Sequence, residues 1–187
     1  MTPRIQKVGL VAHESPQGDW AFEAALSLAR RRGAVLNIFS FVESPYAAPL
    51  DRAPADVPAR TLSAREQIQM DRQLRERFDE RLGDFVEVGF RVCESGRHNR
   101  ELRSCLKRRE YQVLFIPYPT RGATFGNMPI EEFAWRFTAP VVLVGPDGPR
   151  EYRFNPPAEA ISLPAALSGE TYIPLPPPAV LQALPVL

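Results

Sequence analysis

Five short apolar segments recur between residues 1 and 150, and stretches with helical spacing separate them. Apolar runs of this length predict buried strands, and the stretches between them are long enough for crossover helices. Strands that are apolar on both faces indicate a parallel sheet covered by helices on both sides. The sequence therefore predicts an α/β fold with a doubly wound, five-stranded parallel sheet. The expected strands are residues 7–12, 35–42, 85–93, 113–116 and 141–144.

The predicted helices carry recognisable start and stop signals. Asp19 can cap the first helix, which Gly33 ends. Ser63 matches a capping box and opens a charged helix in which every fourth residue from Met70 to Leu82 is apolar. Shorter helices are expected after Asn99 and after Asn127, the latter with Pro129 in its first turn. A fold wound in this way has a crevice at the carboxyl ends of its strands.

Three segments resemble the universal stress protein family. The opening strand and its turn, residues 8–15, are similar to that family's first strand, and residues 94–96 are similar to its turn before the third helix. Residues 111–116 and 138–144 resemble its last two strands. The resemblance covers roughly residues 4–146 and implies a Rossmann-like sheet of order 3-2-1-4-5. It implies a domain over residues 1–148.

The ATP-binding motif of that family is not preserved. ATP-binding members carry G-x2-G-x9-G-S/T, whose glycines let the backbone close around phosphates. Here Pro117 stands at the first glycine position and Thr120 at the second, and counting onward reaches residues 130–131. The alternative register places residues 127–128 at the Gly-Ser pair. Proline also lacks the N–H that would bind phosphate.

The resemblance implies eight positions where a nucleotide would bind. One interpretation is a nucleotide site rebuilt around the loop residues Arg121, Gly122, Thr124, Gly126 and Asn127, with ATP or AMP as its ligand. The other, which we favour, is a loop that has lost its ligand and kept its fold, so that no cofactor and no catalytic residue are expected. The positions are His13, Ser15, Val42, Thr120, Arg121, Gly122, Gly126 and Asn127.

Most of the 20 prolines fall in two segments. Residues 45–62 join the second strand to the second helix and can form a lid, a partner-binding loop or a tolerated insertion. Residues 149–187 combine prolines with many apolar side chains and few charges, unlike a typical disordered tail. We predict that they form an extended arm that docks on a second subunit or on a different protein.

The predicted function is binding or assembly without catalysis. By resemblance, the chain forms a homodimer through the edge of the last strand, Val141, Val142, Leu143 and Val144. The alternative is a nucleotide-responsive stress-response regulator that binds ATP or AMP, with at most slow hydrolysis. A third class, an electron-transfer or redox accessory subunit, rests on fold kinship alone.

Composition excludes several other classes. The chain has 23 basic and 22 acidic residues, so we expect no nucleic-acid partner. It has no apolar run long enough to span a membrane and no signal-peptide core, so we expect a soluble cytoplasmic protein. Cys93 and Cys105 are too few for a disulfide framework and are interpreted as buried small hydrophobes.

A metal site is conceivable but is not predicted. His13 and His98 are expected near the carboxyl edge of the sheet, with Glu14 and Glu94 in turns there. These residues lack the spacing of a ligand pair such as H-x3-H. The alternative is that all four are exposed turn residues.

Overall fold

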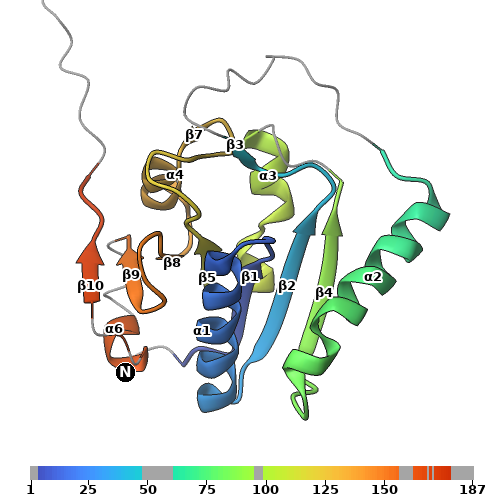
Figure 1. Ribbon diagram of the computed structural model, residues 1–187, viewed down its shortest axis with the longest axis horizontal. Helices are drawn as coiled ribbons and strands as arrows, with labels where there is room; N and C mark the ends of the chain where they lie inside the picture. The colour runs from blue at the N-terminus through green and yellow to red at the C-terminus, as the bar shows by residue number, and fades with distance from the viewer. Residues whose placement is uncertain are drawn as a thin grey trace, which may run out of the picture.

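The computed structural model describes residues 4–47, 61–94, 99–155, 162–167, 169 and 171–177. Its central sheet has seven strands in the order β10-β9-β8-β5-β1-β2-β4 (Figure 1). All neighbours pair in parallel except β8 and β9, which are antiparallel. The strands are β1 (Lys7–Val11), β2 (Val35–Phe41), β4 (Val88–Cys93), β5 (Val113–Pro117), β8 (Val141–Val144), β9 (Glu151–Phe154) and β10 (Thr171–Pro174).

The prediction of an α/β fold with a mostly parallel sheet is confirmed, whereas the prediction of five strands is wrong. The two additional strands, β9 and β10, come from the segment expected to form an arm. The helices are α1 (Pro16–Arg32), α2 (Ala64–Leu82), α3 (Asn99–Cys105), α4 (Ile130–Arg136) and α6 (Leu163–Ala166), with a 3-10 turn at Arg108–Glu110.

The helix signals are correct for α2 and partly wrong for α1 and α4. The capping box of Ser63 is present at the start of α2. Helix α1 begins earlier than expected, because Ser15 Oγ accepts the Gly18 N–H and replaces Asp19 as the cap. Gly33 ends α1 with φ +59°, a left-handed conformation that glycine adopts without strain. Asn127 does not cap α4, whose first residue is Ile130.

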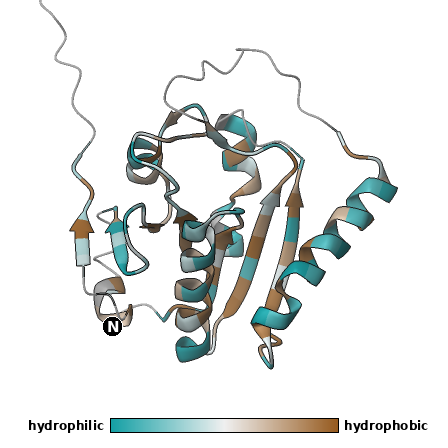
Figure 2. Ribbon diagram, viewed as in Figure 1, coloured by the Kyte–Doolittle hydropathy of each residue, from teal (hydrophilic) through white to brown (hydrophobic). Residues whose placement is uncertain are grey.

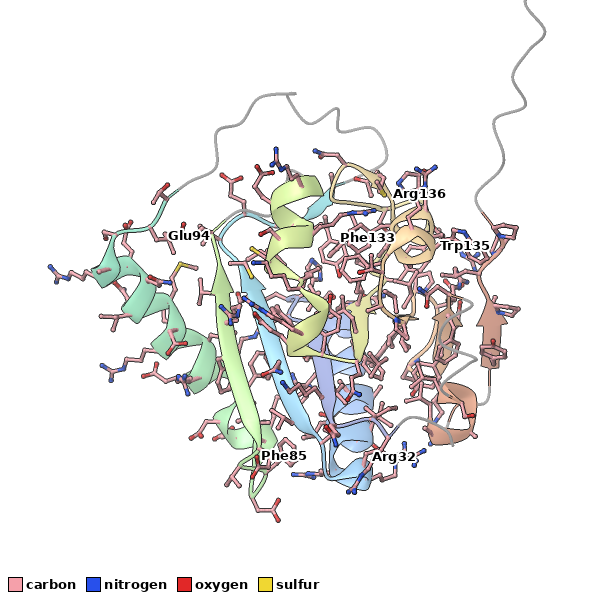
Figure 3. The ribbon with its side chains drawn as sticks, turned by 180° about the vertical axis from the view of Figure 1, so that it is seen from behind. Arg32, Phe85, Glu94, Phe133, Trp135 and Arg136 are labelled. Atoms are coloured by element: carbon pink, nitrogen blue, oxygen red, sulfur yellow. The ribbon has the colours of Figure 1, made fainter. Side chains whose placement is uncertain are left out.

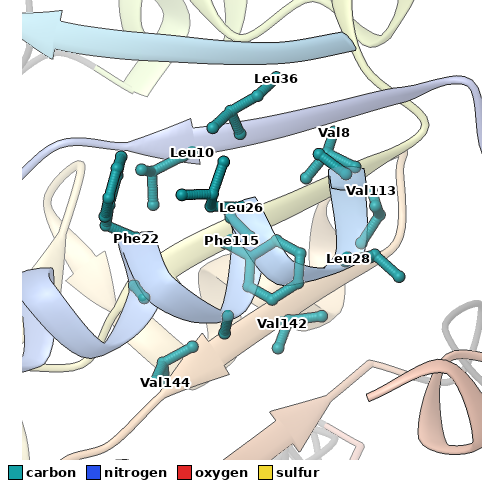
Figure 4. Close-up of a cluster of buried hydrophobic side chains, with 14 of the residues drawn as sticks. Val8, Leu10, Phe22, Leu26, Leu28, Leu36, Val113, Phe115, Val142 and Val144 are labelled. Atoms are coloured by element: carbon teal, nitrogen blue, oxygen red, sulfur yellow. The ribbon is translucent and has the colours of Figure 1, made fainter. Parts of the chain in front are cut away.

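Side chains of the inner strands point alternately to the two faces of the sheet, and a separate hydrophobic core lies on each face. In β5, Val113 and Phe115 pack beneath α1, and Leu114 and Ile116 pack on the opposite face with α3 and α4. Figure 4 shows the α1 side of this arrangement, with Phe115 between the helix and β8. Every residue of β5 is buried. Successive side chains of a strand point to opposite faces, so a strand covered on both sides must be apolar throughout.

The described part of the expected arm packs against the sheet of its own chain. Phe154 of β9 lies opposite Val142 of β8, and β10 continues the sheet beyond β9 (Figure 1). Leu163 of α6 and Leu167, which follows the helix, belong to the α1 core, and Leu175 belongs to the opposite core. The docking-arm prediction is therefore wrong for these residues. Residues 156–161, 168, 170 and 178–187 lie outside the described part of the chain.

The side chain of Asn155, the residue after β9, links this strand to β8 and to the segment that precedes β8. Its side chain is fully buried. Its Oδ1 accepts the Val141 N–H at 2.9 Å, and its Nδ2 donates to the Ala134 carbonyl at 2.9 Å and to the Ala139 carbonyl at 3.2 Å. One amide thus satisfies three buried backbone groups from β8, α4 and the loop between them.

The pairing of β8 with β9 also corrects the predicted dimer edge. Val142, Leu143 and Val144 face Phe154, Arg153 and Tyr152 across the antiparallel ladder. The backbone of Val141–Val144 is therefore occupied and is not available to a second subunit. The strands at the edges of the sheet are β10 and β4.

A second, three-stranded sheet lies above the carboxyl ends of the central strands (Figure 1). It consists of β3 (Tyr46–Ala47), β6 (Thr124–Phe125) and β7 (Met128–Pro129), all antiparallel. Among the described residues, no helix combines the length and apolarity that a membrane span requires.

Candidate functional site

The carboxyl ends of β1, β2 and β5 meet at one edge of the sheet, where the direction of winding reverses. His13 follows β1, Val42 follows β2, and Pro117 is the last residue of β5. Because β2 and β5 flank β1 on opposite sides, this edge is the position at which open α/β sheets bind ligands. Of the predicted site residues, His13 and Val42 therefore lie at this edge.

His13 and Ser15 lie together at the start of α1. His13 Nδ1 is 2.8 Å from Ser15 Oγ, which also accepts the Gly18 N–H at 3.0 Å. A Cβ on Gly18 would lie 1.9 Å from the His13 carbonyl oxygen, so only glycine permits this close approach. Burial lowers the pKa of His13 below its usual 6.5, and the nearby Arg77 lowers it further, so the imidazole is neutral at neutral pH.

Tyr46 of β3 lies across the junction between β1 and β5. Its hydroxyl donates to the Pro117 carbonyl at 2.7 Å. Its ring centroid is 4.4 Å from that of His13 and 4.9 Å from that of Phe125. Side chains from three distant segments thus meet where a ligand would enter between the two strands.

The loop after β5 is closed by a buried tyrosine. The Tyr118 hydroxyl donates to the Glu131 carboxylate and accepts the Gly122 N–H at 3.3 Å. The Arg153 guanidinium lies 5.2 Å from the centre of the Tyr118 ring. Burial, followed by the Glu131 hydrogen bond, raises the pKa of Tyr118 to about 12, so this group stays protonated at neutral pH.

The remaining loop residues have structural partners of their own. Arg121 is exposed and forms an ion pair with Asp147, and Thr120 is exposed beside it. Gly126 (φ +58°) and Asn127 (φ +66°) form the two-residue turn between β6 and β7. Positive φ at both positions is characteristic of a type I′ hairpin. A tight hairpin therefore replaces the helix start that the sequence predicted at Asn127.

A cavity of about 320 Å³ remains beside His13. Glu14 and Arg77 are the charged side chains in its lining, and their ion pair measures 3.1 Å. The two charges cancel, so the cavity has no net attraction for a phosphate. Its lining is Ala12, His13, Glu14, Ser40, Phe41, Val42, Ser44, Pro45 and Arg77.

The structure therefore separates the predicted site residues into two groups. His13 and Val42 line the cavity, and Ser15 holds His13 in place. Gly126 approaches this group through its N–H, which donates to the Pro45 carbonyl at 2.9 Å. Thr120, Arg121 and Gly122 are exposed, and Arg121 is directed to Asp147. Thr120, Arg121 and Gly122 are not among the residues that line the cavity beside His13.

The described part of the chain contains no cluster of metal-binding side chains. Among those residues, no group of three or more histidine, cysteine, aspartate or glutamate side chains is placed to hold a metal ion. His98, which the hypothesis required, lies outside the described residues. Glu14 instead pairs with Arg77.

Sequence reasoning missed a contact between the two cysteines. Cys93 is the last residue of β4 and Cys105 the last residue of α3, and their thiols are hydrogen-bonded. Both line a cavity of about 430 Å³ between these elements. One sequence feature could have indicated this contact. Cys105 lies on the predicted inward face of α3, which is the next helix after the strand that ends at Cys93. Figure 3 shows Glu94, the next residue, at this end of β4.

We compared the chain with models of known protein families and with curated protein sequences. No model of a known protein family matches the chain, and no curated protein sequence matches it significantly.

Proposed function

We propose that this chain is a non-catalytic binding and assembly module of the universal stress protein type. The observation that carries the proposal is Tyr46, whose hydroxyl donates to the Pro117 carbonyl at 2.7 Å across the junction of β1 and β5. The ring lies beside those of His13 and Phe125, and we infer that it blocks the path of a nucleotide to the loop after β5. The order β4-β2-β1-β5-β8 within the sheet supports the family assignment, because the resemblance implies that order.

The electrostatics of the loop after β5 also support a site without phosphate. Pro117 offers no N–H, and the Gly122 N–H is directed to the Tyr118 hydroxyl. The Glu131 carboxylate accepts from Tyr118 in the same region. A bound phosphate would lie near this negative charge without the backbone donors that normally compensate it.

A second function, nucleotide-responsive regulation, is favoured by one observation. The cavity beside His13 and Val42 is about 320 Å³, within the range of small-ligand pockets. A nucleoside can be accommodated there without contact to the loop after β5. This function requires that adenosine and AMP bind about as well as ATP, because the phosphates would contribute little to the binding free energy.

Thermal unfolding of the full chain with adenosine, AMP, ADP and ATP distinguishes the two functions. A ligand that binds the native state must raise the melting temperature. Our proposal expects no shift with any of the four. Stabilisation by adenosine and AMP would instead support the second function, and stabilisation by ATP far beyond that by AMP would contradict both.

Two variants of Tyr46 show whether its ring closes the site. Tyr46→Ala removes the ring from His13 and Phe125, and Tyr46→Phe keeps the ring and removes the Pro117 hydrogen bond. We expect nucleotide binding in Tyr46→Ala and not in Tyr46→Phe. Equal binding by both variants and the parent chain would contradict a closing role.

The assembly part of the proposal now rests on the last ten residues. Residues 178–187 include Val180, Leu181 and Leu184, and they lie outside the described part of the chain. Truncation after Pro177 tests their role while leaving β9 and β10 in place. We expect the truncated chain to have an unchanged melting temperature and a smaller mass in solution by light scattering. An unchanged mass and unchanged partner binding would contradict the assembly role.

A further inference from the structure

The flank of the sheet formed by β4 and α3 contains a pair of thiols that the proposed function does not use. Cys93 is 2% exposed and belongs to the core on the α3 side of the sheet. Cys105 is half-buried and packs against that same core. The two thiols are hydrogen-bonded to each other, so their sulfur atoms are neighbours. Neighbouring sulfur atoms are the first requirement for a disulfide bond.

The two sulfurs differ in their access to solvent. Both cysteines line the cavity, but Cys93 is buried, whereas Cys105 is half-buried. The hydrogen bond to Cys105 is the largest cause, and burial the second, that raises the pKa of the Cys93 thiol. Cys93 therefore keeps its proton at neutral pH, and the half-buried Cys105 is the thiol that a reagent in the cavity reaches first.

The charges around the cavity do not activate the pair. The lining contains three basic side chains, Arg91, Lys107 and Arg109, and three acidic ones, Glu94, Glu101 and Glu110. Arg91 and Glu110 also neutralise each other in an ion pair of 2.8 Å. The lining therefore carries no excess of positive charge, and what distinguishes this pair from two ordinary thiols is proximity.

We propose that Cys93 and Cys105 form a reversible thiol–disulfide pair that hydrogen peroxide oxidises. The Cys105 thiolate attacks one peroxide oxygen, the O–O bond breaks, and a sulfenic acid and hydroxide result. The Cys93 sulfur then loses its proton and attacks the Cys105 sulfur. The S–O bond breaks, and the departing hydroxide takes up a proton. Two thiols and one peroxide thus give one disulfide and two water molecules.

The disulfide would tie the carboxyl end of β4 to the end of α3. At present the hydrogen bond and the shared core hold these ends together. The bond would close the loop between the two cysteines and restrict the unfolded chain, which stabilises the native state. It would also draw α3 against β4 and change the shape of the cavity between them. The inference does not depend on nucleotide binding.

Intact-mass measurement of the full chain after treatment with excess hydrogen peroxide tests this inference. We expect the loss of two hydrogen masses, the loss of both free thiols and recovery on reduction. Electrophoresis without reductant should show a single chain, because the bond is intramolecular. Two free thiols that persist in the folded protein, or a disulfide-linked dimer, would overturn the proposal.

Two single variants test the order of reaction. Cys93→Ser leaves Cys105 without a partner, so its sulfenic acid should accumulate and be trapped by a 1,3-dicarbonyl reagent. Cys105→Ser leaves the buried Cys93, which should react about tenfold more slowly than Cys105 does. Equal reaction rates would contradict the assigned roles. Circular dichroism of both variants verifies that they are folded, and the double variant is the control without thiols.

Discussion

The two flanks of the central sheet are built differently. On the C-terminal flank, all four residues of β8 are buried, and β9 adds the buried Tyr152 and Phe154. On the opposite flank, the edge strand β4 has one buried residue, Cys93, and Arg91 is exposed. Helix α2, which covers that flank, is strongly hydrophilic (Figure 2). It buries three residues in nineteen, Leu74, Phe78 and Leu82.

This difference indicates that the C-terminal flank contributes more to stability and that the β4 flank is easier to deform. The C-terminal flank has apolar contacts on both faces and a fully satisfied buried amide, so local opening there is costly. The β4 flank has cavities of about 430 and 600 Å³ and the exposed apolar side chains Ile68 and Val86. The C-terminal flank has a smaller cavity of about 370 Å³ beside Tyr152, and Tyr172 of β10 is exposed there. We therefore expect mutations on the C-terminal flank to affect folding and mutations on the β4 flank to affect chemistry or binding.

The largest expected effect is that of removing a phenylalanine from the C-terminal flank. Phe154 is 1% exposed, and Phe154→Ala should reduce the free energy of unfolding by about 3–5 kcal/mol. Phe90→Ala on β4 is the matched variant and should cost about 1 kcal/mol, because Phe90 is half-buried under the Arg75 guanidinium. Urea denaturation measures both. Equal losses would remove the distinction between the flanks.

The next effect concerns buried amides. Asn155→Ala would leave three buried backbone groups without their partner, at a cost of about 2–4 kcal/mol. Asn37→Ala on β2 is the control. Its half-buried side chain donates to the Glu110 carbonyl, and its loss should cost about 1 kcal/mol. A larger loss for Asn37→Ala than for Asn155→Ala would contradict the comparison.

A smaller effect is expected from pH at the junction between the flanks. Burial lowers the pKa of His13 in the folded protein below 6.5, so the unfolded chain takes up a proton first as the pH falls. The contribution of His13 to stability is complete above pH 6.5 and decreases as the pH falls through the lowered pKa. Melting temperatures between neutral and mildly acidic pH should decrease less in His13→Gln than in the parent chain. Parallel curves would show that His13 does not contribute.

The smallest effect is expected on the solvent face of α2. Arg72 and Glu76 form an ion pair at 2.8 Å, with side chains that are 79% and 62% exposed. Arg72→Ala should change the free energy of unfolding by at most about 0.5 kcal/mol, because water and salt screen such pairs. A loss above about 1 kcal/mol in urea denaturation would indicate that this face of α2 packs against something else.

Local sequence patterns predicted the elements near which the candidate site lies. Apolar runs and capping residues located β1, β2, β5, β8 and α2, because each signal lies within a short window of the chain. The resemblance placed His13 and Val42 at the carboxyl edge. It also identified Pro117 as an obstacle to phosphate, since a missing N–H is a property of the residue alone.

The sequence by itself determined an alternating α/β chain with an apolar inner sheet. Three features were decided by the tertiary structure. β9 occupies the edge of β8, Tyr46 reaches the carbonyl of Pro117, and Cys105 meets Cys93. Proline content favoured an extended arm for the C-terminal segment, but the open edge of β8 and the apolar faces beside it offered backbone pairing and burial. Such contacts depend on where distant segments return, and no local window of sequence contains that information.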